Sequence, residues 1–307
     1  MREHELEPAG RGGRRKRRFD DDEPHFLKRS RHEPPVFDTT DTGTPDTGDR
    51  WSTWDGALHG PDPWPDWIIT DLGAVDTELG VLKTGKEADV HLVRRSVPDT
   101  DRSVLLAAKR YREPEHRMFH RDAGYLEGRR VRRSRETRAM ATRTSFGRQL
   151  IAGQWAAAEF DALARLWAIG QQTGAVVVPY PVQLSGTELM LEFVGDADQG
   201  AAAPRLAQLR PEEAAVGRLW DQLLDALVIL ARAGLAHGDL SPYNLLVHGD
   251  RLVLIDLPQV VDVVANPQGA ALLARDVKVM TTWFAARGLH HDPVDLTESL
   301  LREANVR

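Results

Sequence analysis

The feature that most constrains this chain is the loop at residues 237–244, which reads His-Gly-Asp-Leu-Ser-Pro-Tyr-Asn. The apolar periodicity before the loop predicts a core helix that begins near Pro211 and closes at Gly234. Two short apolar runs after the loop, separated by residues 248–250, predict a β-hairpin. Because a hairpin returns the chain, Asp256 at its end is expected beside the loop.

The loop and the end of the hairpin carry side chains suited to phosphoryl transfer. Asn244 and Asp256 can supply oxygen ligands that hold Mg²⁺ against phosphate oxygens. Asp239 can orient an attacking hydroxyl and accept its proton, whereas His237 is expected to brace the loop. Asp239 alone would also suit a loop in which Asp and Asn side chains cap backbone groups. The joint pattern favours a catalytic site.

A lysine and a glutamate are expected to pair close to this site. Lys109 ends an apolar strand expected over residues 104–109, where a lone ammonium is unfavourable. Glu159 lies on the apolar face of a helix expected over residues 149–169, where a buried carboxylate needs a partner. Pairing the two leaves Lys109 to contact nucleotide phosphates. The alternative is a purely structural salt bridge.

These residues carry a resemblance to a known family. His-Gly-Asp-Leu-Ser-x-Tyr-Asn, followed by Ile-Asp-x-x-Gln at residues 255–259, closely resembles the RIO family of atypical serine/threonine protein kinases, and we expect a bacterial member of it. The resemblance covers residues 80–285 and also includes Thr84–Val90, Lys109, Glu159–Phe160, Met190–Gly195 and Arg275–Val277.

The resemblance implies an α+β, two-lobed, protein-kinase-like fold. The N-terminal lobe would be a small antiparallel sheet with one helix. The C-terminal lobe would be mainly helical and would lack the activation segment and the peptide-docking helices of ordinary protein kinases. Two departures from ordinary kinases agree with this: Asp256 is followed by Leu257-Pro258, and Ser241 stands where many protein kinases carry a catalytic lysine. Only residues 257–307 follow, which puts broad activity on peptides in doubt.

The resemblance also implies ATP, with Mg²⁺ or Mn²⁺, as the cofactors. The turn at residues 84–90 resembles the phosphate loop of the family, and the Thr84 hydroxyl and Lys86 can reach phosphate oxygens from it. A simple hairpin turn is the alternative, because the turn has one glycine. Asp239 and Asp256 are the expected catalytic residues. In this family the metal-binding aspartate, here Asp256, can also accept phosphate transiently, which implies an ATPase-like cycle.

The stretch between the two lobes would be the hinge that binds the base. By resemblance, the Glu192 carbonyl and the Val194 amide would bind the adenine edge, and Met190 would be the gatekeeper. Composition alone indicates only a buried strand over residues 188–194. A further strand is expected over residues 176–179 because of its run of valines.

Composition divides the chain into four expected regions. Residues 1–50 form a charged tail that is expected to be disordered, because blocks of charge and low hydrophobicity cannot offset the entropy of ordering. Residues 51–78 are rich in tryptophan and are expected to pack on the body as a strap. Residues 79–190 would form the N-terminal lobe, with a flexible arginine-rich loop at 112–148. Residues 191–307 would form the hinge and the C-terminal lobe.

The arginine-rich loop suggests an anionic partner. Residues 128–148 hold eight arginines and one glutamate, which can grip phosphates of a substrate or of RNA. The better-known members of the RIO family act on ribosome precursors, so a protein substrate and an RNA or ribosome-related partner are implied. A solvated basic face is the alternative.

Composition excludes several other classes. The net charge of −6 gives the whole chain no basic signature, and the absence of cysteine excludes disulfides and thiolate chemistry. No apolar run approaches a membrane span, so a cytoplasmic protein without a membrane partner is expected.

Two other functions compete with an atypical Ser/Thr kinase or ATPase. Aminoglycoside- or choline-type small-molecule kinases also use His-Gly-Asp loops, but they usually devote a larger helical region to the acceptor. A nucleotide-sensing scaffold that binds RNA or protein is the other alternative. Retention of Lys109, Glu159, Asp239, Asn244 and Asp256 argues against an inactive site.

Overall fold

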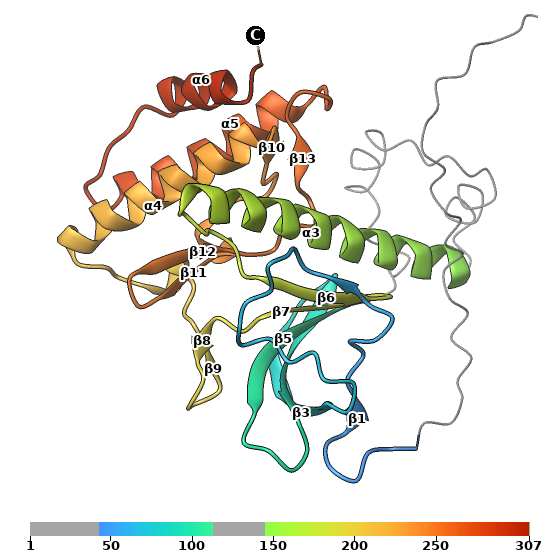
Figure 1. Cartoon of the computed structure of the whole chain (residues 1–307). Helices are drawn as coiled ribbons and strands as arrows, with labels where there is room; N and C mark the ends of the chain where they lie inside the picture. Colours follow the sequence, from blue (N-terminus) through green and yellow to red (C-terminus); the bar gives the residue numbers. More distant parts are fainter. Residues whose placement is uncertain (1–42, 113–144, 307) are drawn as a thin grey trace, which may run out of the picture. The chain divides into compact units, whose positions relative to one another are not determined.

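This computed structural model describes residues 43–112 and 145–306, and only the backbone of residues 145–148. The described residues from Thr44 on form one compact unit (Figure 1). The expectations for the charged tail up to residue 42 and for the arginine-rich loop over residues 113–144 lie outside the described residues.

The N-terminal half is built on a seven-stranded antiparallel sheet with the strand order β1-β3-β4-β5-β7-β6-β2. The strands are β1 (Arg50–Trp51), β2 (Leu58–His59), β3 (Val75–Thr84), β4 (Ala88–Ser96), β5 (Ser103–Tyr111), β6 (Pro181–Ser185) and β7 (Glu188–Glu192). A turn lies on each side of β4, so β3, β4 and β5 pair as consecutive antiparallel neighbours.

One long helix, α3 (Ser145–Thr173), packs on this sheet against β5, β6 and β7 (Figure 1). The side chains of Leu163 and Leu166 on α3 are almost fully buried. The helix is longer than the predicted range 149–169. Gly174, with a φ of +75°, follows the last helical residue and ends the helix, because glycine adopts the left-handed conformation without strain.

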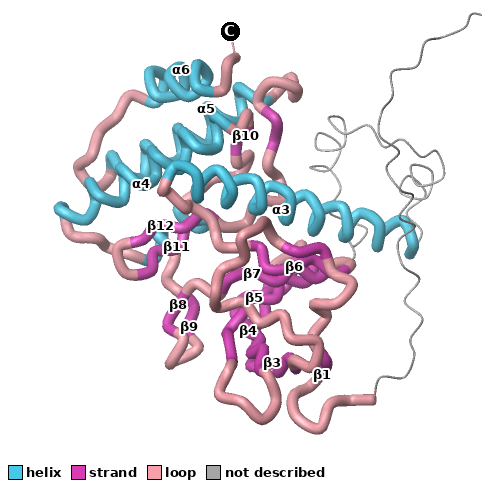
Figure 2. The backbone as a smooth tube through the Cα atoms, in the orientation of Figure 1, coloured by secondary structure: helices cyan, strands magenta, loops and turns pink. Residues whose placement is uncertain are grey.

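The C-terminal half is mainly helical (Figure 2). Its helices are α4 (Glu213–Arg232), α5 (Gly269–Ala285) and α6 (Pro293–Glu303), and its hairpin is formed by β11 (Leu245–His248) and β12 (Arg251–Leu254). Shorter pieces are β8 (Gly195–Asp196), β9 (Ala201–Ala202), η1 (Leu206–Gln208), β10 (Leu235–Ala236), η2 (Pro242–Asn244) and β13 (Val261–Asp262). Leu219, Leu223 and Leu227 of α4 are buried in the core, as the helical period of the sequence predicts.

Two details of the sheet differ from the prediction. Residues 176–179 form no strand, and the strand that pairs with β7 is β6, from Pro181 to Ser185. The sheet also begins before Leu79, because β1 and β2 pair with β3 and β6. Two-residue strands are too short to show an alternation of apolar and polar residues, so sequence periodicity cannot reveal them.

The tryptophan-rich residues between β1 and β3 lie on the other face of the sheet. Trp54 is 6% exposed, stacks on His59 with ring centroids 3.9 Å apart, and packs with Ile68 and Val93 in a second apolar core. Trp64 meets Trp54 edge to face at 5.0 Å. No helix within residues 43–112 and 145–306 is long and apolar enough to cross a membrane.

Candidate active site

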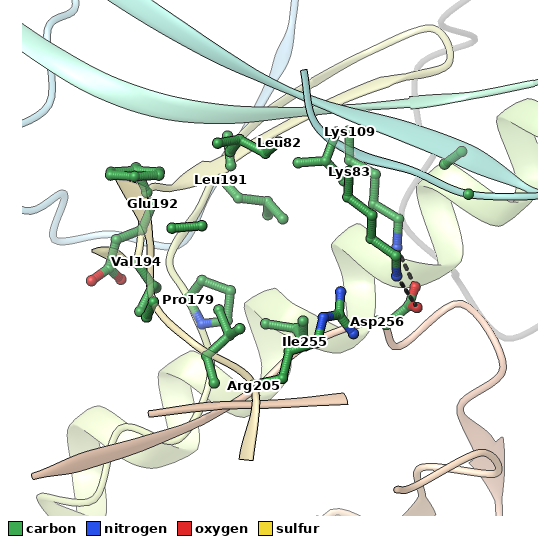
Figure 3. Close-up of a pocket in the computed structure, with 18 of the residues that line it drawn as sticks. Leu82, Lys83, Lys109, Pro179, Leu191, Glu192, Val194, Arg205, Ile255 and Asp256 are labelled. Carbon is green, nitrogen blue, oxygen red and sulfur yellow. Dashed lines mark hydrogen bonds and ion pairs between the residues drawn. The ribbon is translucent and has the colours of Figure 1, made fainter. Parts of the chain in front are cut away.

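A cavity of about 600 Å³ lies between the sheet and the hairpin β11–β12 (Figure 3). Its volume falls in the range that holds small ligands. Val90 and Ala107 line it from the sheet, and Leu246 and Ile255 line it from the hairpin. These apolar side chains form two walls, which suit a flat aromatic base between them.

The inner end of the cavity holds a buried cation between two carboxylates. The Lys109 Nζ atom lies 2.9 and 2.7 Å from the two Glu159 oxygens and 2.6 Å from Asp256 Oδ1. Glu159 also accepts hydrogen bonds from the Tyr111 hydroxyl and, at 3.0 Å, from the Leu257 N–H. The pairing of Lys109 with Glu159 is therefore present in the structure.

Electrostatics in this cluster favour the charged forms of Lys109 and Asp256. Burial opposes the charge of Lys109, but Glu159 and Asp256 raise the pKa of its ammonium above the ordinary value. Burial opposes the charge of Asp256 in the same way, but Lys109 lowers the pKa of that carboxyl to about 2. Burial, together with the Glu159 charge, raises the pKa of Tyr111. Lys109 is thus an ammonium and Asp256 a carboxylate at neutral pH.

The loop at residues 237–241 is fixed by two neighbouring residues of α5. The Asp276 carboxylate, which is 1% exposed, accepts from the Gly238 N–H at 2.7 Å and the Leu240 N–H at 3.0 Å. Arg275 donates to the Gly238 carbonyl, and its Nη2 lies 3.5 Å from Asp239 Oδ1. The loop therefore presents the Asp239 carboxylate, which is 57% exposed, at a fixed place.

Hydrogen bonds connect Asp239 with the residues around Asp256. The Asn244 side-chain amide donates to the Asp239 carbonyl at 2.9 Å, and the Ile255 N–H donates to the Asn244 carbonyl at 3.0 Å. His237 Nε2 donates to the Ile255 carbonyl at 3.1 Å, which agrees with a bracing role. The predicted trio of Asp239, Asn244 and Asp256 thus lies in adjoining, hydrogen-bonded segments.

The donor set fits a magnesium ion that also binds phosphate. Within the described parts of the chain, no three His, Cys, Asp or Glu side chains gather as a complete metal site. Asn244 and Asp256 offer two oxygen ligands, and Mg²⁺ commonly takes one or two protein ligands and completes its shell with water and phosphate oxygens.

Of the other residues predicted to bind the nucleotide, some line the cavity and others do not. Lys86, Glu192 and Val194 line the cavity. The carbonyl of Val194 accepts from the Ala203 N–H at 2.9 Å, but no residue of the described ranges accepts from its N–H, although Val194 is 6% exposed. That buried donor fits a ligand with an acceptor at its edge. Thr84 is exposed at the end of β3 and does not line the cavity.

Met190 is not placed as the gatekeeper that the resemblance implied. It pairs with Ala108 across β5 and β7, its side chain is fully buried in the second apolar core, and Arg95 lies 3.2 Å from its sulfur. The next residue, Leu191, pairs with Ala107, and both line the cavity. Neighbouring side chains of a strand point to opposite faces, so Met190 and Leu191 cannot both face the cavity. Leu191 is the one that faces it.

Among the cavity residues that the sequence did not predict, three bear on the chemistry of the site. Lys83 lies 3.7 Å from Asp256 Oδ2, Arg205 lines the cavity before η1, and Tyr111 holds Glu159. The position of Tyr111, two residues after Lys109 on the same face of a strand, was a signal that could have been used. Lys83 gave no such signal, because a β-bulge between Val81 and Lys83 turns its side chain to the cavity face.

Protein kinases bind ATP with a buried lysine–glutamate pair beneath an antiparallel sheet, and the fold and the site put the chain in this class of phosphotransferase. The RIO domain model matches residues 107–296. The chain belongs to the RIO family of atypical serine/threonine protein kinases.

Individual relatives agree with this family. The chain is 32% identical over 226 residues to the RIO-type serine/threonine-protein kinase Rio1 of Haloferax volcanii, which covers 74% of this chain and 69% of that protein. It is 26% identical to the serine/threonine-protein kinase RIO1 of Saccharomyces cerevisiae, over 72% of this chain and 46% of that protein. It is 27% identical to the serine/threonine-protein kinase RIO3 of Homo sapiens, over 72% of this chain and 41% of that protein. The chain spans less than half of the last two. The expected bacterial origin stays a prediction.

Proposed function

We propose that the chain binds ATP with Mg²⁺ and transfers the terminal phosphoryl group to serine or threonine hydroxyls, including its own. One observation carries this proposal: Lys109 is held as a charged group between Glu159 and Asp256 at the inner end of an apolar cavity. A buried ammonium with two anionic partners at the end of a base-sized slot is suited to the phosphates of a nucleotide.

Binding would use both ends of the cavity. The apolar walls would hold the adenine, with the Val194 N–H and the Glu192 carbonyl at its edge. The Glu192 carboxylate is engaged elsewhere, with Arg251 at 3.2 Å and the Tyr180 N–H at 3.0 Å. Lys109 and Lys86 would contact phosphate oxygens. Closing the walls on the base would also exclude water from the inner end.

Transfer would use Asp239 as the base. Its carboxylate would take the proton of the attacking hydroxyl while the hydroxyl oxygen forms its bond to the terminal phosphorus. The bond between that phosphorus and the bridging oxygen breaks, and ADP leaves with that oxygen. Arg275, 3.5 Å from Asp239, and Asn244, on its carbonyl, would keep the base in place.

The metal would sit between the loop and the hairpin. Asn244 and Asp256 would hold Mg²⁺, which when bound neutralises charge on the phosphate oxygens. An ATPase cycle through Asp256 is a second candidate activity, because this carboxylate lines the cavity and is ionised at neutral pH. In that cycle an Asp256 oxygen attacks the terminal phosphorus, ADP leaves, and water then hydrolyses the acyl phosphate.

Asp239→Asn tests the proposal. With labelled ATP and MgCl₂, the variant should lose phosphoryl transfer by roughly 10²- to 10⁴-fold, because the amide cannot take the proton, and should keep ATP affinity. Asp250→Asn is the matched control, since Asp250 is 94% exposed on a hairpin turn. Mass spectrometry of the product separates phosphoserine or phosphothreonine from an acid-labile phosphate on Asp256.

Other outcomes would count against the proposal. Full activity of Asp239→Asn would remove Asp239 from the mechanism. No turnover by the unmodified chain with Mg²⁺ or Mn²⁺ would favour a nucleotide-sensing scaffold, and transfer only to aminoglycosides or choline would favour a small-molecule kinase. An RNA or ribosome-related partner at the arginine-rich loop, and a cytoplasmic location, stay predictions.

A further inference from the structure

We infer that Lys83 is a further lysine that binds the phosphates of the nucleotide, beside Lys109 and Lys86, an inference that rests on the nucleotide binding proposed above. The position of this side chain on the cavity face, its partner and its exposure carry the inference. Figure 3 shows the Lys83 and Lys109 side chains converging on Asp256 at the inner end of the cavity.

A β-bulge brings Lys83 to the cavity. In the pairing of β3 with β4, Val81 lies opposite His91 and Lys83 lies opposite Val90, so Leu82 is an extra residue on β3. Leu82 and Lys83 both line the cavity, although neighbouring residues of a regular strand face opposite sides. Bulges re-aim side chains in this way, and they are frequent beside active sites.

The pairing across the sheet puts Lys83 in line with Lys109. Lys83 pairs with Val90, and Val90 pairs with Lys109 on the next strand. Residues directly opposite each other on neighbouring antiparallel strands point to the same face. The two lysines therefore reach down from one face of the sheet, with one valine between them.

Both lysines contact the Asp256 carboxylate, but the Lys83 side chain is more exposed and has fewer contacts than that of Lys109. Lys109 Nζ lies 2.6 Å from Asp256 Oδ1, and Lys83 Nζ lies 3.7 Å from Oδ2. The Lys83 side chain is 41% exposed, against 9% for Lys109, and Lys109 is also fixed by Glu159. Lys83 makes the longer, more exposed contact, so its ammonium can leave Asp256 at little cost.

A bound nucleotide would give Lys83 a better partner than Asp256. The proposed function directs Asp256 to the metal, which removes the anion that Lys83 contacts now. The same event brings the oxygens of two or three phosphates to the inner end of the cavity. Arg205, which also lines the cavity, is itself a cation and donates to the Tyr243 carbonyl, so it offers Lys83 no replacement for this anion. Lys83 would therefore pair with a phosphate oxygen.

Calorimetric titrations with ADP, ATP and adenosine, each with MgCl₂, test the inference. Lys83→Met keeps the length of the side chain and removes its charge. It should weaken ADP and ATP binding by roughly 10- to 100-fold, the effect of one charged hydrogen bond, and leave adenosine binding within about 2-fold. Lys83→Arg should restore most of the affinity. Lys278→Met, a matched change at an exposed lysine of α5, should bind all three ligands like the unmodified chain.

The outcomes are distinct. Unchanged or tighter ADP binding by Lys83→Met would overturn the inference and leave the proposed function in place. An equal loss of adenosine binding would also overturn it, because the effect would then lie in the shape of the cavity. Failure of the unmodified chain to bind ADP or ATP would overturn the proposed function together with this inference.

Discussion

At the scale of single residues, the Glu159 carboxylate is a junction between segments that are far apart in the sequence. Its oxygens accept from Lys109 and Tyr111 of β5 and from the Leu257 N–H after the hairpin. The carboxylate is 1% exposed, so water cannot replace a lost partner. Removing one member of a buried pair leaves an uncompensated charge, which is strongly destabilising.

Glu159→Gln should therefore lower the free energy of unfolding by about 3 kcal/mol, measured by urea denaturation. The amide removes the charge that stabilises Lys109 and replaces one acceptor with a donor. Glu298→Gln is the control, because Glu298 is 63% exposed and lies 3.9 Å from Arg302, and it should change stability by less than about 0.5 kcal/mol. Equal effects in the two variants would contradict the assigned role of Glu159.

The residue scale also shows how far sequence reasoning reaches. The cost of burying a lone charge predicted the pairing of Lys109 with Glu159, which the structure confirms. The same reasoning could not find Lys83, because a bulge changes which face a strand residue occupies and leaves no mark in the period-2 pattern. The gatekeeper assignment to Met190 failed for a related reason. A shift of one residue along a strand moves a side chain to the opposite face, and here Leu191, not Met190, lines the cavity.

At the scale of elements, ion pairs hold the short edge strand β1 on the sheet. Glu188 of β7 lies 2.7 Å from Arg50 of β1 and 2.6 Å from Arg110 of β5. Although burial favours the neutral acid, Arg50 and Arg110 keep the pKa of Glu188 below its ordinary value of 4.5. Its carboxylate thus connects three strands through charge.

Glu188→Gln should destabilise the chain at neutral pH, and the difference from the unmodified chain should shrink as the pH falls below 4.5. In the unfolded chain Glu188 takes up a proton near that value, whereas in the folded chain it stays ionised to lower pH. Its contribution is therefore complete above 4.5 and disappears toward the lower, folded pKa. Urea denaturation of both proteins at about pH 7 and about pH 3.5 measures this; a difference independent of pH would contradict it.

The sequence predicted an element best where its apolar pattern extends over many residues or a clear turn signal marks it. The apolar stripe of α4 and the hairpin β11–β12 follow the sequence closely, because several turns or a clear turn signal support each. The prediction of a strand over residues 176–179 was wrong. A run of valines indicates that a segment is buried, but it does not show that the segment pairs with a neighbouring strand. Those residues are buried or half-buried, but they run outside the sheet.

At the scale of the whole molecule, the described chain from Thr44 on is one compact unit with the cavity between its sheet and its hairpin. The resemblance to the RIO family implied an antiparallel sheet with one helix in the N-terminal part and a mainly helical C-terminal part, and the structure agrees with this. The sequence could not give the shape of the cavity, which depends on side chains from several distant segments.

Binding of ADP should stabilise this unit as a whole. At about 100 times the dissociation constant, ADP with MgCl₂ should raise the free energy of unfolding by about 2.7 kcal/mol, and urea denaturation should show one transition with and without it. The reason is that residues of both the sheet and the hairpin line the cavity in which the ligand would bind. Two transitions, of which ADP moves only one, would mean that the two halves unfold independently.

The junction at Glu159 has a consequence for inhibitor design. The carboxylate sits on α3, so a compound wedged between this helix and β5 would separate it from Lys109 and from the Leu257 backbone at once. Such a compound would not need to compete with cellular ATP for the base slot. It would act by removing the carboxylate that holds the Lys109 ammonium in place.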